Sequence, residues 1–311
     1  MRGSRLSTML PALTVALAAA CDPPTTPDDG RSFVGATLSM HAVTTWGPAS
    51  SVDLGGVNHL NTPALEGCPF ESPNGRTLFF ASNRDGQIDI WTSTRESGTG
   101  AWGEPGRLPA PVNSEFNDFC PTPLPGDGLL FVSTRPGGCG GADIYQTKLH
   151  PTLGWLDPEP LGCEVNSAGN EFSPSHVPAA GEMLFFSSDR GGQDDIYVTV
   201  RGPDGGWGSP APVAELNFPD FNSARPNVSQ DRRTIVFDSN RPGGLGGADV
   251  WSAMRASVHE PWLEPARLGP NVNTEFNETR ASLSRDGKRL YFGSNRPGYQ
   301  GDSDIFVAIR Y

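Results

Sequence analysis

Apolar and polar residues alternate in five separate stretches of the chain, and the five stretches share one order. Leu or Ile, Phe and Ser occupy every second position, an Arg stands two residues after the Ser, and a short turn leads to Asp, then Ile or Val, then an aromatic residue. A period of two predicts a strand with one buried face, and no stretch of the mature chain shows sustained 3.6-residue periodicity. We therefore expect strands and essentially no helix.

The five copies recur at a regular spacing. Successive arginines lie 51, 55, 51 and 55 residues apart, which indicates a repeat architecture. Within each copy two apolar runs flank a turn, Gly-rich at residues 136–141 and 242–247, and this arrangement is typical of a β-hairpin. The repeated charged residues are Arg84 with Asp89, Arg135 with Asp143, Arg190 with Asp195, Arg241 with Asp249, and Arg296 with Asp304.

Two further strands are expected in each unit. A Ser-Pro-Asn-Gly or Ser-Arg-Asp-Gly turn, at residues 72–75 and 284–287, joins the hairpin to an earlier strand. A Trp-x-x-Pro-x-x-Leu or Val segment lies between units. About four short antiparallel strands in about 53 residues are the size and content of one β-propeller blade. The Trp segments begin at Trp102, Trp155, Trp207 and Trp262, with a diverged copy at Trp46.

Taken in this order, Ser-Pro-[Asn/Asp]-Gly, Phe-x-Ser-x-Arg and Asp-Ile-[Tyr/Trp] resemble the TolB-like repeats, the Pro-Asp relatives of the WD-type β-propellers. The resemblance extends from about Trp46 to Tyr311. It implies a propeller fold and, by analogy with TolB, a partner that is an envelope lipoprotein or an outer-membrane-associated complex. It does not assign a function, because propellers serve as scaffolds, receptors and enzymes.

The order of the segments predicts how the ring closes. The units begin with the Trp46 segment, and the fifth unit ends at Tyr311 directly after its third strand. We expect residues 46–53 to supply the outer strand of the fifth blade, which leaves no long sheet edge open. The predicted fold is all-β, a propeller of five four-stranded blades within residues 41–311. Six blades, as in TolB, would need a further blade between Cys21 and Trp46.

The start of the chain predicts export. Two arginines precede an apolar run from Met9 to Ala20, which is too short to span a bilayer and is typical of a signal peptide over residues 1–20. The residues before Cys21 resemble a lipobox, which would make Cys21 a lipidated first residue, although ordinary signal peptidase would equally accept them. We expect residues 21–40 to form a flexible tether. The predicted location is the bacterial cell envelope, periplasmic or on the cell surface, with the lipid as the membrane contact.

Four cysteines remain besides Cys21, and an even number is typical of disulfides in an oxidising compartment. Cys68 and Cys120 precede Pro at equivalent positions of adjacent units, whereas Cys139 lies in a hairpin loop and Cys163 in the next connection between units. We expect the disulfides Cys68–Cys120 and Cys139–Cys163. The alternative is that some of these residues are simply small buried side chains.

Charge and missing motifs limit the partners and the chemistry. The formal charge of −12 becomes −14 once the two arginines of residues 1–20 are removed, so nucleic acid would be repelled. The chain has no Gly-x-Ser-x-Gly elbow, no His-Glu-x-x-His motif and no close Cys/His pairing, and we expect no cofactor and no metal site. The five repeated aspartates are equivalent, whereas catalytic carboxylates need different environments. Each is expected to cap its hairpin or to pair with the Arg of its own blade, such as Asp89 with Arg84.

The connections that enter the inner strands break the symmetry of the repeat. At the start of each inner strand stand Cys68, Cys120, Ser173, Arg225 and Arg280, and two positions earlier stand Glu66, Asp118, Glu171, Ser223 and Glu278. We expect the acids to form a ring around the channel mouth. Two adjacent blades would then present cations where three present small side chains. This rim, with Arg225, Arg280 and the four acids, is the candidate binding site. The alternative is that its residues shape turns and neutralise one another.

The function predicted from the sequence is a non-catalytic protein-interaction scaffold of the cell envelope, whose partner is an envelope protein or lipoprotein. Two alternatives stay open. One is a carbohydrate-active enzyme, a lyase or glycosidase, and the other is a sensor of a cation or small ligand. Both would act at the channel mouth.

Overall fold

The computed structural model describes residues 45–53, 59–98, 100–178, 181–297 and 300–310. They belong to one of two compact units of the chain, the unit from Met40 to Tyr311. The predicted signal peptide, the tether and Cys21 lie outside the described residues. Among the described residues there is no helix, and none therefore that is long and apolar enough to cross a membrane.

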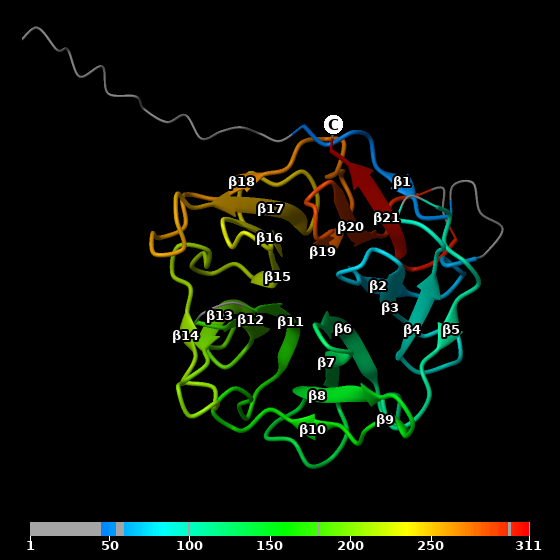
Figure 1. The fold of residues 1–311 in the computed structure, drawn as a ribbon. Coiled ribbons are helices and arrows are strands. Elements are labelled where there is room, and N and C mark those ends of the chain that lie inside the picture. The colour runs from blue at the N-terminus through cyan, green and yellow to red at the C-terminus, as the bar shows by residue number, and fades with distance from the viewer. Residues whose placement is uncertain (1–44, 54–58, 99, 179–180, 298–299, 311) are drawn as a thin grey trace, which may run out of the picture. The chain divides into compact units, whose positions relative to one another are not determined.

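Five antiparallel sheets surround a common axis, as Figure 1 shows. In four of the five sheets the inner strand comes first in the chain and a two-residue outer strand comes last. The first blade is β2 (Glu66–Glu71), β3 (Thr77–Ser82), β4 (Asp89–Thr94) and β5 (Gly106–Arg107), and the second is β6 (Asp118–Leu124), β7 (Gly128–Ser133), β8 (Asp143–His150) and β10 (Glu159–Pro160). The third is β11 (Glu171–Val177), β12 (Met183–Ser188), β13 (Asp195–Val200) and β14 (Ala211–Pro212), and the fourth is β15 (Ser223–Val228), β16 (Thr234–Ser239), β17 (Asp249–Met254) and β18 (Ala266–Arg267). A short extra strand, β9 (Gly154–Trp155), pairs with the end of β8.

The fifth blade takes its outer strand from the beginning of the described chain. It consists of β19 (Glu278–Leu283), β20 (Arg289–Ser294), β21 (Asp304–Ile309) and β1 (Ser50–Ser51). Ser50 lies opposite Val307 and Ser51 opposite Phe306, and Figure 1 shows β1 in blue beside β21 in red. The prediction of five blades, with residues 46–53 closing the last one, is confirmed, and the six-bladed alternative is wrong for the described residues.

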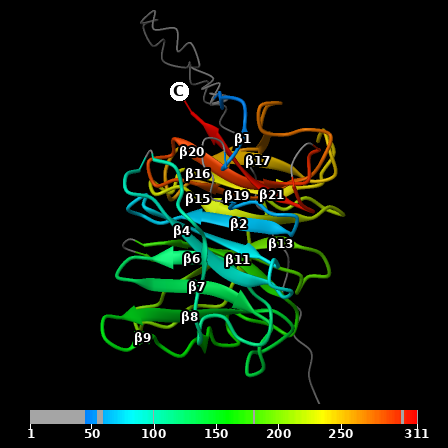
Figure 2. The same ribbon diagram turned by 90° about the vertical axis from the view of Figure 1, so that its right-hand side faces the viewer.

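The core lies between neighbouring blades. The Leu or Ile and the Phe of each repeat, such as Leu78 and Phe80, are completely buried in all five copies. One apolar cluster joins Val236 and Val250 of the fourth blade to Leu290 and Phe292 of the fifth. Full burial of such a side chain contributes about 1.5–3 kcal/mol. The apolar residues of the period-two pattern therefore stabilise the fold by packing between neighbouring sheets. From the side, Figure 2 shows the inner strands β2 and β6 next to each other.

All inner strands begin at the same face of the ring. Glu66 pairs with Ser82, and Ser82 pairs with Asp89, so the loop at residues 83–88 lies at the face where β2 begins. We call this side the inlet face. It carries the loops 83–88, 134–142, 189–194 and 240–248, and the opposite face carries the turns that follow the inner strands, such as residues 72–76.

Candidate functional site

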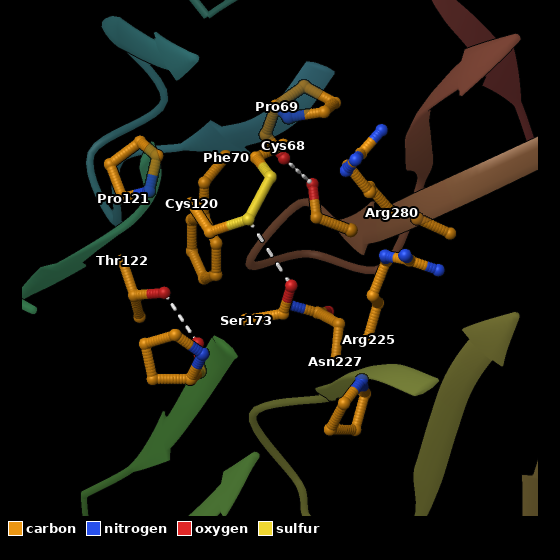
Figure 3. A pocket seen from close by; sticks show the side chains of 14 residues that line it. Cys68, Pro69, Phe70, Cys120, Pro121, Thr122, Ser173, Arg225, Asn227 and Arg280 are labelled. Atoms are coloured by element: carbon orange, nitrogen blue, oxygen red, sulfur yellow. Dashed lines mark hydrogen bonds between the residues drawn. A yellow bond between two sulfur atoms is a disulfide. The ribbon is translucent and has the colours of Figure 1, made fainter. Parts of the chain in front are cut away.

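The inner strands surround a cavity of about 30 Å³ on the axis, which we call the channel neck. One residue from each blade lines it at the equivalent position, and the residues that follow these in the strands complete its wall. Figure 3 shows the Cys68–Cys120 disulfide on one side and the two arginines on the other. The five equivalent residues are Cys68, Cys120, Ser173, Arg225 and Arg280.

A β-bulge in every inner strand turns these five residues towards the axis. The pairing register shifts just after the first two residues of the strand, and the backbone adopts a left-handed φ of 47° to 58° at all five positions. Such a conformation costs about 1–3 kcal/mol for a residue with a side chain, and bulges redirect side chains. Its recurrence in five blades indicates that the repeat itself places the neck residues.

Each seam between neighbouring inner strands is crossed by a bond. These strands belong to different sheets, so no ladder joins them, and side chains supply the connection instead. Figure 3 shows the disulfide and the hydrogen bond from Thr122. Around the ring the links are the Cys68–Cys120 disulfide, Thr122 Oγ1 to Pro174 O (2.5 Å), Val228 N to Ser175 Oγ (3.0 Å), Leu283 N to Asn227 Oδ1 (2.9 Å) and Ser282 Oγ to Pro69 O (2.5 Å).

Both expected disulfides are present. Cys68–Cys120 joins the first two blades at the neck. Cys139–Cys163 joins the loop between β7 and β8 to the connection that follows β10, so it lies at the inlet face of the second blade. The two bridges close chain segments with sequence separations of 52 and 24 residues. They restrict the unfolded chain, which is the usual way a disulfide stabilises a fold.

The expected acidic ring around the channel mouth is wrong. Glu66, Asp118, Glu171 and Glu278 are 0% exposed and point into the blades. Glu66 accepts hydrogen bonds from Thr62 N (2.9 Å), Thr62 Oγ1 (2.7 Å) and Ser82 Oγ (2.7 Å). A carboxylate leaves water only where hydrogen bonds and a cation compensate the loss of hydration, and the interior of the blade supplies both.

The repeated arginine is that cation, so its expected pairing with the aspartate of its own hairpin is also wrong. Arg84 Nη2 lies 3.1 Å from Glu66 Oε1, and its Nε donates to Ser82 Oγ at 2.9 Å. The bond to the Ser of its own strand directs the guanidinium towards the inner strand. The same pair occurs at Arg135 with Asp118 (2.7 Å), Arg190 with Glu171 (3.0 Å) and Arg296 with Glu278 (3.1 Å).

The repeated aspartates cap their hairpins, which was the other structural role considered for them. In the blades with long loops they accept backbone N–H groups of the loop, as Asp143 does from Cys139 and Gly140 at 3.1–3.2 Å. Asp249 and Asp304 accept equivalent bonds. In the two blades with short turns, Gln87 and Gln193 donate to Asp89 and Asp195 instead. Asp89 also forms an ion pair with Arg107 (2.7 Å).

The fourth blade departs from this scheme. Ser223 stands where the other blades have an acid, and it accepts a hydrogen bond from Arg241 Nη2 at 2.8 Å. Arg241 is 7% exposed and lies over the rings of Phe237 and Trp251. Burial lowers the pKa of Arg241 to about 10. Among the described residues it is the repeat arginine without a carboxylate partner.

Five asparagines, four of them buried and Asn217 partly buried, were missed by the sequence analysis. Each uses its amide to bind both the N–H and the C=O of one residue in the third strand of the preceding blade, as Asn113 does with Ile90 at 2.8 and 2.9 Å. A signal was available, because each follows a Leu or Val at the same position before the inner strand. These residues clamp successive blades together: Asn61, Asn113, Asn166, Asn217 and Asn273.

A buried carboxylate on the fourth blade joins the two neck arginines. Asp238 is 2% exposed. Its Oδ2 accepts a hydrogen bond from Arg225 Nη1 (2.6 Å), and its Oδ1 accepts one from the backbone N–H of Arg280 (2.8 Å). The other four blades have Ala, Val, Ser and Gly at this position, so a charge between the repeat Phe and Ser was the signal that the sequence analysis passed over.

The guanidinium of Arg280 faces the neck without such a partner. Among the described residues no hydrogen bond or ion pair involves this guanidinium. It extends across the seam to the first blade, where a Cβ placed on Gly67 would meet Arg280 Nη1 at 3.4 Å. Burial first, and then the charge of Arg225, lower the pKa of Arg280 to about 10, and Asp238 opposes both. Burial likewise raises the pKa of the nearby Asp194, which Arg225 opposes.

At the opposite face the channel widens into a cavity of about 310 Å³, and the residues that line it include Glu71, His176 and Arg285. Glu71 is buried and accepts hydrogen bonds from Arg95, Arg289 and Tyr291. Among the described residues that line the two axial cavities, Glu71 is the only carboxylate, and it lines the wider cavity. No group of three His, Cys, Asp or Glu side chains in the described part of the chain is placed to hold a metal ion.

The fold is shared with several proteins of known structure. TolB from Acinetobacter baumannii aligns with a TM-score of 0.50 and 18% identity over 80% of this chain, which spans 55% of that protein's length. A thermostable family-43 glycoside hydrolase aligns with a TM-score of 0.54 and 12% identity, covering 81% of this chain and 91% of the hydrolase. The catalytic domain of the GH62 α-L-arabinofuranosidase from Coprinopsis cinerea aligns with a TM-score of 0.54 and 13% identity, covering 85% of this chain and 96% of that domain.

No protein-family model matches the chain, and no curated protein matches it. At these identities the structural similarity establishes the propeller fold and leaves the function to the residues of the site. The protein is therefore a five-bladed β-propeller, and its β-propeller fold is similar to those of TolB and of family-43 and GH62 glycoside hydrolases.

Proposed function

We propose that this protein is a non-catalytic binding module of the bacterial cell envelope, which holds an envelope protein or lipoprotein on its inlet face and is tethered by a lipid at Cys21. One observation carries the proposal. The carboxylates that the repeat supplies are buried in structural bonds, whereas residues that depart from the repeat gather at one place on the axis: Arg225, Arg280 and Asp238. The TolB-like order of the repeats and the fold shared with TolB support the choice of compartment and partner.

A glycosidase is the second candidate, because the glycoside hydrolases share this fold equally well. Retaining and inverting glycosidases act with two carboxylates that lie about 5–10 Å apart on either side of the scissile bond. The described residues that line the two axial cavities include a single carboxylate, Glu71, and it is held by two arginines and a tyrosine. The lining therefore favours binding over hydrolysis.

The binding face is tested by crosslinking from two matched leucines of the fourth blade. Leu245 lies in the loop between β16 and β17 on the inlet face and is 48% exposed, and Leu263 lies between β17 and β18 on the opposite face and is 46% exposed. A photoreactive residue in place of either leucine is introduced into the full chain in its native envelope. We expect a discrete crosslinked product from position 245 and none from position 263.

Equal products from the two positions, or a product from position 263 alone, would contradict the proposed face. The purified protein is also incubated with envelope polysaccharides and arabinan oligosaccharides. Hydrolysis of any of these substrates at a rate that depends on the folded protein would favour the glycosidase over the binding module.

Anchoring makes a separate prediction. Cys21→Ala is expected to move the protein from the membrane fraction to the soluble fraction, because a single cysteine carries the proposed lipid. Its far-ultraviolet circular dichroism and melting temperature are expected to match those of the native protein, since the described core begins at Trp46, well after Cys21 in the chain. Fractionation of cells that express both forms measures the outcome. A variant that stays with the membrane would rule out the lipid anchor.

A further inference from the structure

We propose that the channel neck is a binding site for a carboxylate group, which Arg280 and Arg225 hold between them. The inference goes beyond the proposed function, because it concerns a small ligand of the isolated ring and requires neither a protein partner nor the lipid. Of the alternative kept open above, a sensor of a cation or small ligand, it takes the small ligand, since the acids that would attract a cation are buried in the blades.

The balance of charge in the neck leaves one cation over. Arg225 is neutralised by its ion pair with Asp238 (2.6 Å). The second oxygen of Asp238 accepts the backbone N–H of Arg280 (2.8 Å) rather than its guanidinium. The charge of Arg280 is therefore uncompensated by any hydrogen bond or ion pair with the described residues, and an anion in the neck would supply that compensation.

The wall around this cation selects the kind of anion. The opposite side of the neck is the Cys68–Cys120 disulfide, and Ser173, the one hydroxyl residue among the five equivalent residues, donates from its Oγ to Cys120 Sγ at 3.3 Å. The neck thus offers a guanidinium facing an apolar wall. A planar guanidinium binds a carboxylate through two parallel N–H···O bonds, and the methyl or methylene group of an organic acid suits the disulfide side.

The size of the neck agrees with this choice. Its volume of about 30 Å³ admits about two water-sized groups, because each needs about 10–15 Å³ by this measure. This is room for a small group such as the two oxygens of a carboxylate. The bulge fixes the backbone of Arg225 and Arg280, at φ values of 58° and 56°, so the site is formed before the ligand arrives.

The test uses the full chain and measures binding of ¹³C-labelled acetate by NMR titration. We expect saturable binding with one site per chain. Arg280→Ser is expected to weaken it at least about tenfold, because charge-assisted hydrogen bonds to the carboxylate are lost. This substitution gives the fifth blade the residue that the third blade already has at the left-handed position, Ser173. Arg76→Ser, at an exposed position, is the control and is expected to leave the affinity unchanged.

Two results would overturn the proposal. One is the absence of saturable binding up to about 50 mM acetate, which sets the weakest affinity of interest. The other is an Arg280→Ser variant that binds acetate as tightly as the native chain. If Arg280→Ser does not fold, Arg280→Lys takes its place, because it keeps the charge and removes the planar guanidinium. An affinity for acetate unchanged by Arg280→Lys would also overturn the proposal.

Further probes define the source of the carboxylate. Phosphate is expected to bind more weakly than acetate, and tighter binding of phosphate would overturn the carboxylate assignment. N-acetylglycylglycine is compared with its amide. If N-acetylglycylglycine competes with acetate and its amide does not, the site can hold the terminal carboxylate of a longer ligand. If neither compound competes, the site binds only free small acids. Failure of all these arms leaves the crosslinking at position 245 untouched, so the two proposals are tested separately.

Discussion

Glu71→Gln is expected to lower the free energy of unfolding by about 3–5 kcal/mol, because removing one partner of a buried ionic network leaves the others without compensation. Glu71 is 3% exposed. It accepts a hydrogen bond from Arg95 of its own blade (2.8 Å) and two from Arg289 of the fifth blade (2.9 Å each). Tyr291 donates to it at 2.7 Å, and its pKa is raised, by burial first and then by the charge of Glu71.

The expected loss is large because these contacts lie where the ring is joined. Glu71 belongs to the first blade, and Arg289 and Tyr291 belong to the fifth, so the network crosses the seam between the first and last blades of the chain. Urea unfolding followed by tryptophan fluorescence measures the change. Glu104→Gln, at an exposed position of the same blade, is the control with an expected change within about 0.5 kcal/mol. Equal stability of the two variants would show that the network contributes nothing.

The architecture could be predicted from the sequence because the repeat is tied to burial. Leu78, Phe80 and their counterparts alternate with polar residues, and a sheet packed between two others buries such a set completely in every blade. Spacing fixed the number of blades, and the extra Trp46 segment fixed the closure. The number of blades and the closure depend on which residues are buried, and the alternation of apolar and polar residues predicts that burial.

The direction of the charged side chains could not be predicted in the same way. Arg84 is five residues from Asp89 and eighteen from Glu66, and sequence proximity favoured the wrong partner. The deciding contact is the hydrogen bond from Arg84 Nε to Ser82 Oγ, which turns the guanidinium away from the hairpin. At Arg225 and Arg280 the side-chain direction is set by a β-bulge, because the left-handed backbone conformation turns these side chains towards the axis.

Departures from the repeat carried more information than the repeat itself. Asp238, Ser223 and Glu71 each occupy a position where the other blades have a different kind of residue. Each departure changes a charge balance: Asp238 pairs with Arg225, Ser223 leaves Arg241 without an acid, and Glu71 links the first and fifth blades. Aligning the five units with one another, position by position, selects all three residues by their amino-acid type alone.

The largest loss is expected from removal of the closing strand. Deleting residues 22–53 should lower the free energy of unfolding by about 5 kcal/mol or more, since burial of one tryptophan alone contributes about 3–5 kcal/mol and the strand adds several hydrogen bonds. Trp46 is 5% exposed and packs with Phe292 and Phe306. Asn271 Nδ2 donates to Trp46 O at 2.6 Å, and Gly47 N donates to Ile309 O at 2.7 Å.

The same deletion should also expose β21 as an open edge, and open edges pair with other chains. We expect aggregation, seen as a rise in light scattering on heating, together with the lower melting temperature. Deleting residues 22–32 alone leaves every described strand in place, so its melting temperature should stay within about 2 °C of the native value. Trp46→Ala should lie between the two deletions. Identical melting temperatures for both deletions would show that residues 46–53 do not hold the ring closed, and the fifth blade would then be stable with three strands.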